Sequence, residues 1–117
     1  MKKSNKVVEV EKGKIHIVVE LIEYISNAVL SKTIIKKVTG NETASSFDAG
    51  EELAEKRSPF DTFIQIIEGV AEVNINNKKF IMKQGDGIVI PAHSNHYFTA
   101  NEQFKMISTV IKSGYKD

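Results

Sequence analysis

The sequence predicts an all-β domain folded as a closed barrel or jelly roll, and three observations lead to that class. From residue 28 onward the chain consists of about eight short β-branched or alternating runs. Turns containing glycine or asparagine separate these runs at close spacing. The chain has 117 residues and no cysteine, which leaves room for one core without disulfides. We therefore expect a flexible N-terminal segment over residues 1–14 and a single barrel domain over residues 15–117.

The stretch that follows the polar, lysine-rich N-terminal segment carries two periodicities. Residues 15–25 (IHIVVELIEYI) place four apolar side chains at helical spacing, namely Val18, Leu21, Ile22 and Ile25. In the same stretch Ile15, Ile17 and Val19 alternate as they would in a strand. We interpret the stretch as a short helix over residues 20–26, packed over one mouth of the fold, with a short strand as the alternative.

The predicted strands follow in order, each between turn residues. They are residues 29–39, 43–47, 63–67, 70–75, 79–82, 88–90, 96–100 and 104–111. Asn76 and Asn77 predict a tight hairpin. Gly69 and Gly85 are expected to end strands at reversals that need a positive φ. Pro91 suits the end of a strand because it has no amide proton to donate.

Strand alternation predicts which side chains line the interior. Along residues 62–67 the even-numbered side chains, Thr62, Ile64 and Ile66, share one face, and the odd-numbered ones share the other. Ile88 and Ile90 are expected to face inward as well. A mostly apolar lining with a few polar groups suits a small organic ligand, and it also suits a packed core.

Composition and charge exclude several classes of function. The formal net charge is +1 and Arg57 is the only arginine, so we expect no nucleic-acid partner. No apolar run approaches the length of a membrane span, so we expect no membrane partner. The first residues lack the apolar run of a signal peptide, which predicts a cytoplasmic location.

Two stretches have the spacing of known sequence motifs and resemble the cupin superfamily. The first begins at Gly50 (GEELAEKRSPFDTFIQIIEG), and the second begins at Gly85 (GDGIVIPAHSNHYFTA). In the second stretch Gly85, Pro91 and His96 stand at the intervals of the cupin motif. The resemblance covers residues 28–111 and implies a cupin-type jelly-roll β-barrel. It also implies a homodimer, because cupins commonly pair through β-strands.

The metal-ligand positions of the cupin pattern are the part from which this sequence departs. At the positions of the usual two histidines, carboxylate or amide, and final histidine the chain carries Lys56, Ser58, Thr62 and His96. Three of these are not usual ligands of transition metals, and a lysine repels a cation. We therefore expect no cofactor. The alternative is one divalent transition metal held by His96 with His93, which occupies the position of a motif glycine.

The predicted site is a ligand pocket formed by Lys56, Ser58, Thr62, Ile64 and His96. The leading hypothesis is a stand-alone domain, metal-free or metal-poor, that binds a small organic ligand in its barrel. An inward Lys56 can hold a carboxylate, sulfate or phosphate group, whereas on a solvated strand edge it has no such role. His96 is interpreted either as a ligand-binding residue or as a core histidine bonded to a neighbour such as Ser58 or Thr62.

Two other functions remain open at this point. The resemblance also implies an enzyme of the isomerase, epimerase, lyase or dioxygenase type, with His96 as acid or base or in an atypical metal site. Alternatively, the barrel is a filled structural core that dimerises through the apolar residues 18–25. The sequence leaves open whether the chain is an enzyme.

Overall fold

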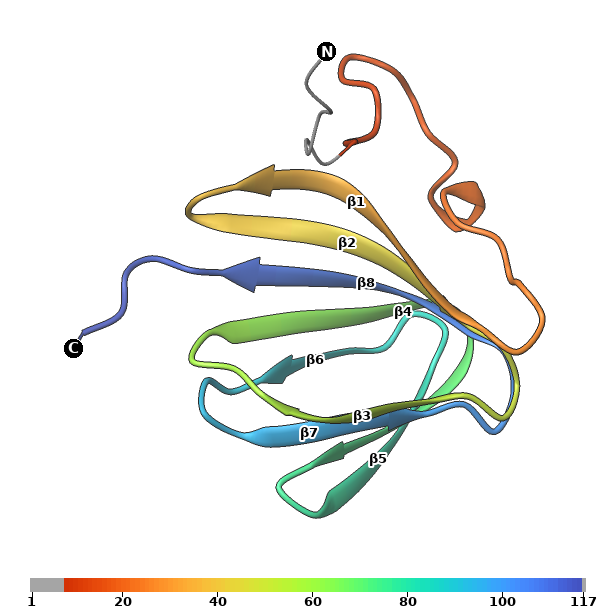
Figure 1. Cartoon of the computed structure of the whole chain (residues 1–117), viewed down its shortest axis with the longest axis vertical. Coiled ribbons are helices and arrows are strands. Elements are labelled where there is room, and N and C mark those ends of the chain that lie inside the picture. The colour runs from red at the N-terminus through yellow and green to blue at the C-terminus, as the bar shows by residue number, and fades with distance from the viewer. Residues whose placement is uncertain (1–7, 117) are drawn as a thin grey trace, which may run out of the picture.

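The computed structural model describes residues 8–116 and confirms the all-β class (Figure 1). One 3₁₀ turn precedes eight strands. Their bounds are η1 Val18–Glu20, β1 Val29–Lys37, β2 Gly40–Phe47, β3 Glu52–Arg57, β4 Asp61–Ile75, β5 Lys78–Lys83, β6 Gly87–Ile90, β7 Asn95–Thr99 and β8 Phe104–Ile111. No helix within residues 8–116 is long and apolar enough to cross a membrane.

The strands form two curled antiparallel sheets that share β4. The N-terminal half of β4 pairs with β8 and β6, and β8 leads on to β2 and β1; we call this sheet A. The C-terminal half of β4 pairs with β5 and β7, and β7 pairs with β3; we call this sheet B. The buried core lies between the inner faces of the two sheets. Together the sheets give the barrel that the sequence predicts (Figure 1).

Gly69 lies inside β4, at the point where the strand passes from sheet A to sheet B. Its φ is 79°, and the register against β8 shifts between Ile66 and Glu68. A Cβ at this position would lie 2.1 Å from the carbonyl oxygen of Gln103. The expected positive φ is confirmed, but the expected strand end is wrong. Here glycine allows a long strand to bend, so the predicted runs 63–67 and 70–75 belong to a single strand.

Three further turn predictions are confirmed. Asn76 and Asn77 have φ values of 48° and 68° and join β4 to β5 as a tight hairpin. Gly85 has a φ of 95°, and Pro91 directly follows β6. The strand β3 was absent from the predicted runs, because four of the six residues in its sequence ELAEKR are charged. As an edge strand that pairs only with β7, it tolerates such a composition.

The main core lies between the sheets, and a smaller one lies on the outer face of sheet A. Phe47 stacks on Phe104 with ring centroids 4.4 Å apart inside the barrel. Outside it, Ile22 is buried against Ala44 and Ile107.

The helix predicted over residues 20–26 is wrong, since that part of the chain holds only the end of the single 3₁₀ turn. The segment covers the outer face of sheet A instead of a mouth. A seven-residue helix gains few internal hydrogen bonds, whereas an irregular chain can bury Ile22 on that face.

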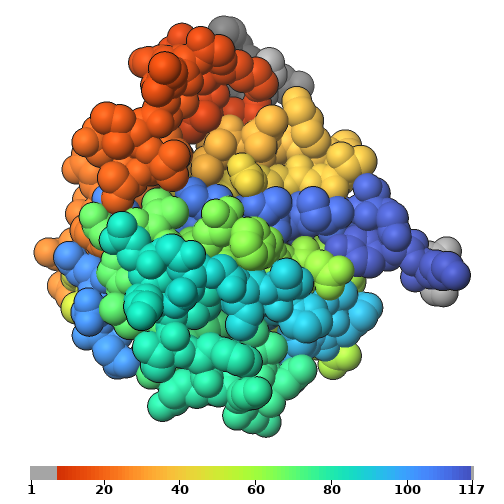
Figure 2. Space-filling view, turned by 180° about the vertical axis from the view of Figure 1, so that it is seen from behind, coloured from red at the N-terminus to blue at the C-terminus, as the bar shows by residue number. Residues whose placement is uncertain are grey.

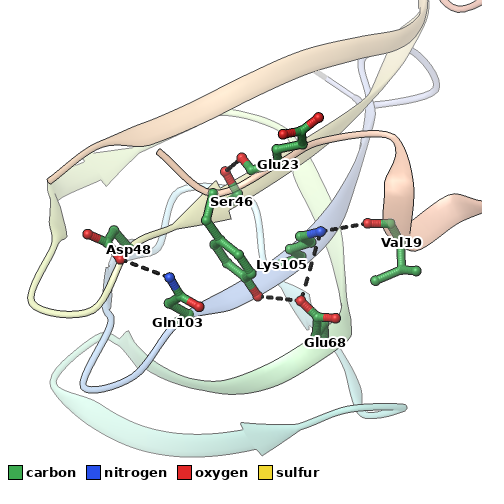
Figure 3. Close-up of polar contacts among 8 residues, drawn as sticks. Val19, Glu23, Ser46, Asp48, Glu68, Gln103 and Lys105 are labelled. Carbon is green, nitrogen blue, oxygen red and sulfur yellow. Dashed lines mark hydrogen bonds and ion pairs between the residues drawn. The ribbon is translucent and has the colours of Figure 1, made fainter. Parts of the chain in front are cut away.

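Residues 8–25, which we call the arch, are anchored to sheet A by a buried lysine at one end (Figure 3). Lys105 is only 8% exposed, and its Nζ donates to the carbonyl oxygen of Val19 at 2.7 Å. The same Nζ lies 3.9 Å from the Glu68 carboxylate and 4.9 Å from the centre of the Tyr24 ring. Tyr24 donates to Glu68 at 2.7 Å; burial, followed by this hydrogen bond, raises the pKa of Tyr24 well above its ordinary value.

The other end of the arch is bound to the edge strand β1. The amide of Val10 donates to the carbonyl oxygen of Ile34 at 3.3 Å. The Glu9 carboxylate accepts a bond of 2.6 Å from the amide of Lys36, and this bond lowers the pKa of Glu9. Of the segment predicted to be flexible, residues 1–7 lie outside the described residues.

Candidate functional site

A cavity of about 570 Å³ opens between the inner faces of the two sheets. All five residues of the predicted pocket, Lys56, Ser58, Thr62, Ile64 and His96, line it. The other lining residues are Ser31, Asn41, Thr43, Ser45, Leu53, Ala54, Arg57, Ile90, Tyr97, Phe98, Met106, Ser108 and Val110. The predicted inward facing of Ile64 and Ile66 is confirmed, since both are buried while Phe63 and Gln65 are exposed.

His96 projects from β7 into the cavity and is half-buried. Its ring meets Phe98 edge-on with centroids 6.1 Å apart, and its Nδ1 lies 3.5 Å from the carbonyl oxygen of Ser94. Burial lowers the pKa of His96 below its ordinary value of 6.5, and the charge of Lys56 lowers it further. The Ser94 carbonyl and the Glu55 charge raise it in part. The imidazole is therefore mainly neutral at pH 7.

A bulge in β3 decides which charged side chain faces His96. Leu53 pairs with Phe98, but the register shifts by one residue, so that Lys56 and not Glu55 pairs with His96. In a regular antiparallel pair Glu55 would stand opposite His96, on the same face as Leu53. The bulge thus replaces a carboxylate by an ammonium group at the cavity wall.

The cavity lining is positively charged at its mouth. Lys56 and Arg57 both line it and are exposed residues. Within residues 8–116 neither forms an ion pair, and no aspartate or glutamate belongs to the lining. Hydroxyl groups from Ser45, Ser58 and Thr62 supply hydrogen-bonding groups on the walls.

Two loops are bound together at the mouth. The amide of His93 donates to the carbonyl oxygen of Ser58 at 2.6 Å, and the Asp61 carboxylate accepts from the amide of Ala92 at 2.8 Å. The amide of Asp61 donates to the hydroxyl of Tyr115 at 2.8 Å. His93 is exposed, does not line the cavity and has a φ of 68°, so it adopts the left-handed conformation typical of the glycine that the motif places there.

The comparison with known proteins identifies the family. Residues 45–110 match a family model described as a cupin domain. The chain belongs to the cupin family. The match spans both motif stretches, and residues from both of them line the cavity of this cupin.

Solved structures of similar proteins agree with this fold. A conserved protein of unknown function from Streptococcus pyogenes is 26% identical with a TM-score of 0.86, covering 97% of this chain and 100% of that one. A cupin superfamily protein from Desulfitobacterium hafniense is 24% identical with a TM-score of 0.84, covering 92% and 99%. A cupin 2 conserved barrel domain protein from Leptotrichia buccalis is 30% identical with a TM-score of 0.78, covering 80% and 46%. No curated protein matches the sequence.

The residues at the metal-ligand positions of this cupin do not fit a metal ion. Lys56, Ser58 and Thr62 offer one ammonium group and two neutral hydroxyls beside the single imidazole of His96. Within residues 8–116 no three histidine, aspartate or glutamate side chains gather closely enough to hold an ion. His93, the alternative partner of His96, is not part of the cavity wall.

Sequence reasoning missed the polar residues that β2 and β8 contribute to the cavity. Thr43 and Ser45 on β2 and Ser108 on β8 line it, and each alternates with residues on the outer face. This alternation was visible in the sequence. Which face turned inward depended on pairing with β1 and β4, which is not readable from the two segments alone.

Proposed function

We propose that this cupin binds a small organic anion in its barrel cavity and that it does so without a metal ion. The observation that carries the proposal is the charge of the lining. Two cationic side chains, Lys56 and Arg57, stand at the mouth, and the described lining contains no carboxylate to neutralise them. Such a wall favours anions and disfavours cations.

The shape of the cavity supports an organic ligand with one charged end. Its volume of about 570 Å³ lies within the usual range for ligand pockets, roughly 300–1,000 Å³. Ile64, Ile90 and Met106 offer apolar surface for the body of a ligand. We infer that the anionic group lies near Lys56 and Arg57, where a carboxylate or phosphate accepts charge-assisted hydrogen bonds. The hydroxyls of Ser58 and Thr62 then bond the polar atoms beside it.

Acid–base catalysis by His96 is the second candidate function. A neutral imidazole is able to accept a proton near pH 7, which supports this reading. No carboxylate of the described lining orients the ring, and Asp61 is committed to the amide of Ala92. The arrangement therefore favours binding over this type of catalysis.

A titration series tests the proposal. The purified protein is titrated calorimetrically at low salt with aliphatic and aromatic carboxylates and with sugar phosphates. We expect saturable binding of at least one anion, weakened about tenfold by Lys56→Gln or Arg57→Gln, because each substitution removes a charge-assisted hydrogen bond.

The control is Lys32→Gln, which removes a lysine of β1 that does not line the cavity. It changes the net charge by the same amount and should leave the affinity unchanged. The absence of any saturable anion, or an equal loss of affinity in Lys32→Gln, would overturn the proposal. Turnover of the bound anion that disappears in His96→Gln would instead support the second candidate.

The homodimer and the cytoplasmic location stay predictions. The arch exposes apolar side chains that a dimer interface would cover, with Ile15 93% and Ile17 61% exposed. Sedimentation velocity over a range of protein concentrations tests whether this cupin dimerises.

A further inference from the structure

A second cleft lies on the outer face of sheet A, opposite to the face that lines the barrel cavity, and beneath the arch. Its volume is about 420 Å³. The residues that line it come from the arch and from strands β1, β2, β4 and β8: Val10, His16, Val18, Leu21, Ile34, Glu42, Gln65, Ile67 and Ile107. Figure 2 shows the arch, in red and orange, beside β1 in yellow. This cleft shares no residue with the barrel cavity.

The cleft is preformed, because both ends of its outer wall are held. Lys105 and Glu68 hold the C-terminal part of the arch through Val19 and Tyr24, as described above (Figure 3). The Val10 amide is hydrogen-bonded to β1 at the other end. Two residues of the arch between Val10 and Tyr24, namely Val18 and Leu21, line the cleft. A ligand entering it would not have to order the arch first, which lowers the entropic cost of binding.

The chemistry of the cleft is the reverse of that in the barrel. Six of its lining residues are aliphatic, and Glu42 is the only aspartate, glutamate, lysine or arginine among them within residues 8–116. The Glu42 carboxylate is half-buried and accepts a bond of 2.7 Å from the hydroxyl of Thr109, which fixes its position. The one imidazole, His16, donates its Nε2 proton to the carbonyl oxygen of Glu11. An apolar wall with one oriented carboxylate favours a cation with a hydrocarbon body.

We propose that this cleft is a second binding site, which takes a small amphiphilic cation of the alkylammonium class. The alkyl chain lies against Ile34, Ile67 and Ile107 and displaces water from them. The ammonium group donates to the free lone pairs of the Glu42 carboxylate. The site is independent of the anion site in the barrel.

The test uses hexylammonium and hexanoate, which share one chain length and carry opposite charges. Each is titrated into the full-length ¹⁵N-labelled protein and followed by amide chemical shifts. We expect hexylammonium to bind saturably and to shift the signals of Ile34, Glu42 and Ile107. Hexanoate should bind these residues at least about tenfold more weakly, because its carboxylate faces Glu42.

Two pairs of variants separate the head-group contact from the apolar contact. Glu42→Gln keeps the shape and an oxygen that accepts from Thr109, and it should weaken hexylammonium about tenfold, whereas Glu102→Gln on an exposed turn should not. Val18→Lys places a cation in the cleft wall and should abolish binding, whereas Val38→Lys, at a position that is 95% exposed and outside the cleft, should not.

Four results would overturn the proposal. They are no saturable binding of hexylammonium, equal binding of hexanoate at the same residues, an unchanged affinity in Glu42→Gln, and shifts confined to Thr62 and His96 of the barrel. Shifts of the cleft residues on protein dilution alone would also overturn it, because they would assign the cleft to a second copy of the chain.

Discussion

Sheet A has two faces whose chemistry differs although the same strands build them. Along β2 the odd-numbered residues 41–45 line the barrel cavity, while Glu42 lines the outer cleft and Ala44 belongs to the outer core. Along β8 the residues 106, 108 and 110 line the cavity, while Ile107 lies outside. Because side chains alternate along a strand, successive residues of one strand face either the barrel cavity or the outer face of the sheet. The alternating position of a residue along its strand therefore decides which region it lines. We call the barrel cavity the inner region, and the cleft beneath the arch the outer region.

The two regions also acquire their charge in different ways. The outer carboxylate of Glu42 follows from regular pairing of β2 with β8, in which it stands opposite Thr109. In the barrel cavity, the position of one of the two cations follows from an irregularity, because the bulge in β3 brings Lys56 opposite His96.

The largest expected effect comes from Gly69→Ala, which removes the bend that both regions need. The new Cβ would lie 2.1 Å from the carbonyl oxygen of Gln103, at a φ of 79°. We expect the free energy of unfolding to fall by about 2–5 kcal/mol, from the left-handed backbone and the steric clash together. Urea denaturation measures this loss, and both kinds of ligand should bind less well.

Gly85→Ala is the matched control for this substitution. Its φ of 95° is also positive, but a Cβ there meets no atom within 4 Å. We expect a loss of only about 1–2 kcal/mol, from backbone strain alone. Equal losses in the free energy of unfolding in the two variants would mean that the close approach of β4 to Gln103 adds nothing to the destabilisation by Gly69→Ala.

A smaller effect, confined to the outer region, is expected from Lys105→Met. Methionine keeps most of the buried volume but loses the hydrogen bond to Val19 and the contacts with Glu68 and the Tyr24 ring. A hydrogen bond from a charged donor contributes about 1.5–3 kcal/mol, so the arch should open at least about tenfold more often. Hydrogen exchange of the Glu20 and Leu21 amides, which are bonded within the 3₁₀ turn, measures this opening.

Lys83→Met serves as the control for Lys105→Met, since Lys83 is an exposed residue of β5 that lines neither the barrel cavity nor the outer cleft. It should leave the exchange of both amides unchanged. Anion binding in the barrel should survive Lys105→Met, because neither Lys105 nor the residues it contacts, Val19, Tyr24 and Glu68, line that cavity. Unchanged exchange in Lys105→Met would show that the apolar contacts of Ile22 and the hydrogen bonds to β1 hold the arch without Lys105.

The sequence predicts the barrel well because the turns between its strands are marked by local sequence signals. Asn76-Asn77, Gly85 and Pro91 act through their own backbone preferences, so each could be placed without knowing its partners. The position of Gly69 inside β4 was missed for the opposite reason. A glycine with positive φ suits a turn and a bend equally, and the register against β8 decides between them.

The site was predictable only as far as it follows the motif spacing. His96 and Ser58 stand where the motif intervals place them, and both line the cavity. The facing of Lys56 depends on the bulge in β3, and no residue of the ELAEKR segment marks that bulge by itself. The outer cleft lay beyond sequence reasoning, because the helical spacing of residues 18–25 concealed an irregular arch.

The smallest expected effect is the pH dependence that His96 gives to the inner region. Burial lowers the pKa of His96 below 6.5 in the folded protein, so between that lowered value and 6.5 the unfolded chain binds more protons than the folded one. Stability is therefore kept above pH 6.5 and decreases as the pH falls through this window. Urea midpoints measured at about pH 8 and about pH 5 should show this decrease in the native protein and a smaller one in His96→Gln.

Lys56→Gln tests how the charge of Lys56 contributes to the lowered pKa of His96. Because the Lys56 charge helps to lower the pKa of His96, its removal should raise that pKa, which ring-proton NMR reads directly. Lys32→Gln, outside the cavity, should leave the pKa of His96 where it is. If the two variants give the same titration, then Lys56 does not act on His96, and the bulge in β3 does not set the charge of the inner region. Binding of hexylammonium outside the barrel should be the same in both variants, because Glu42 and Lys56 stand on opposite sides of sheet A.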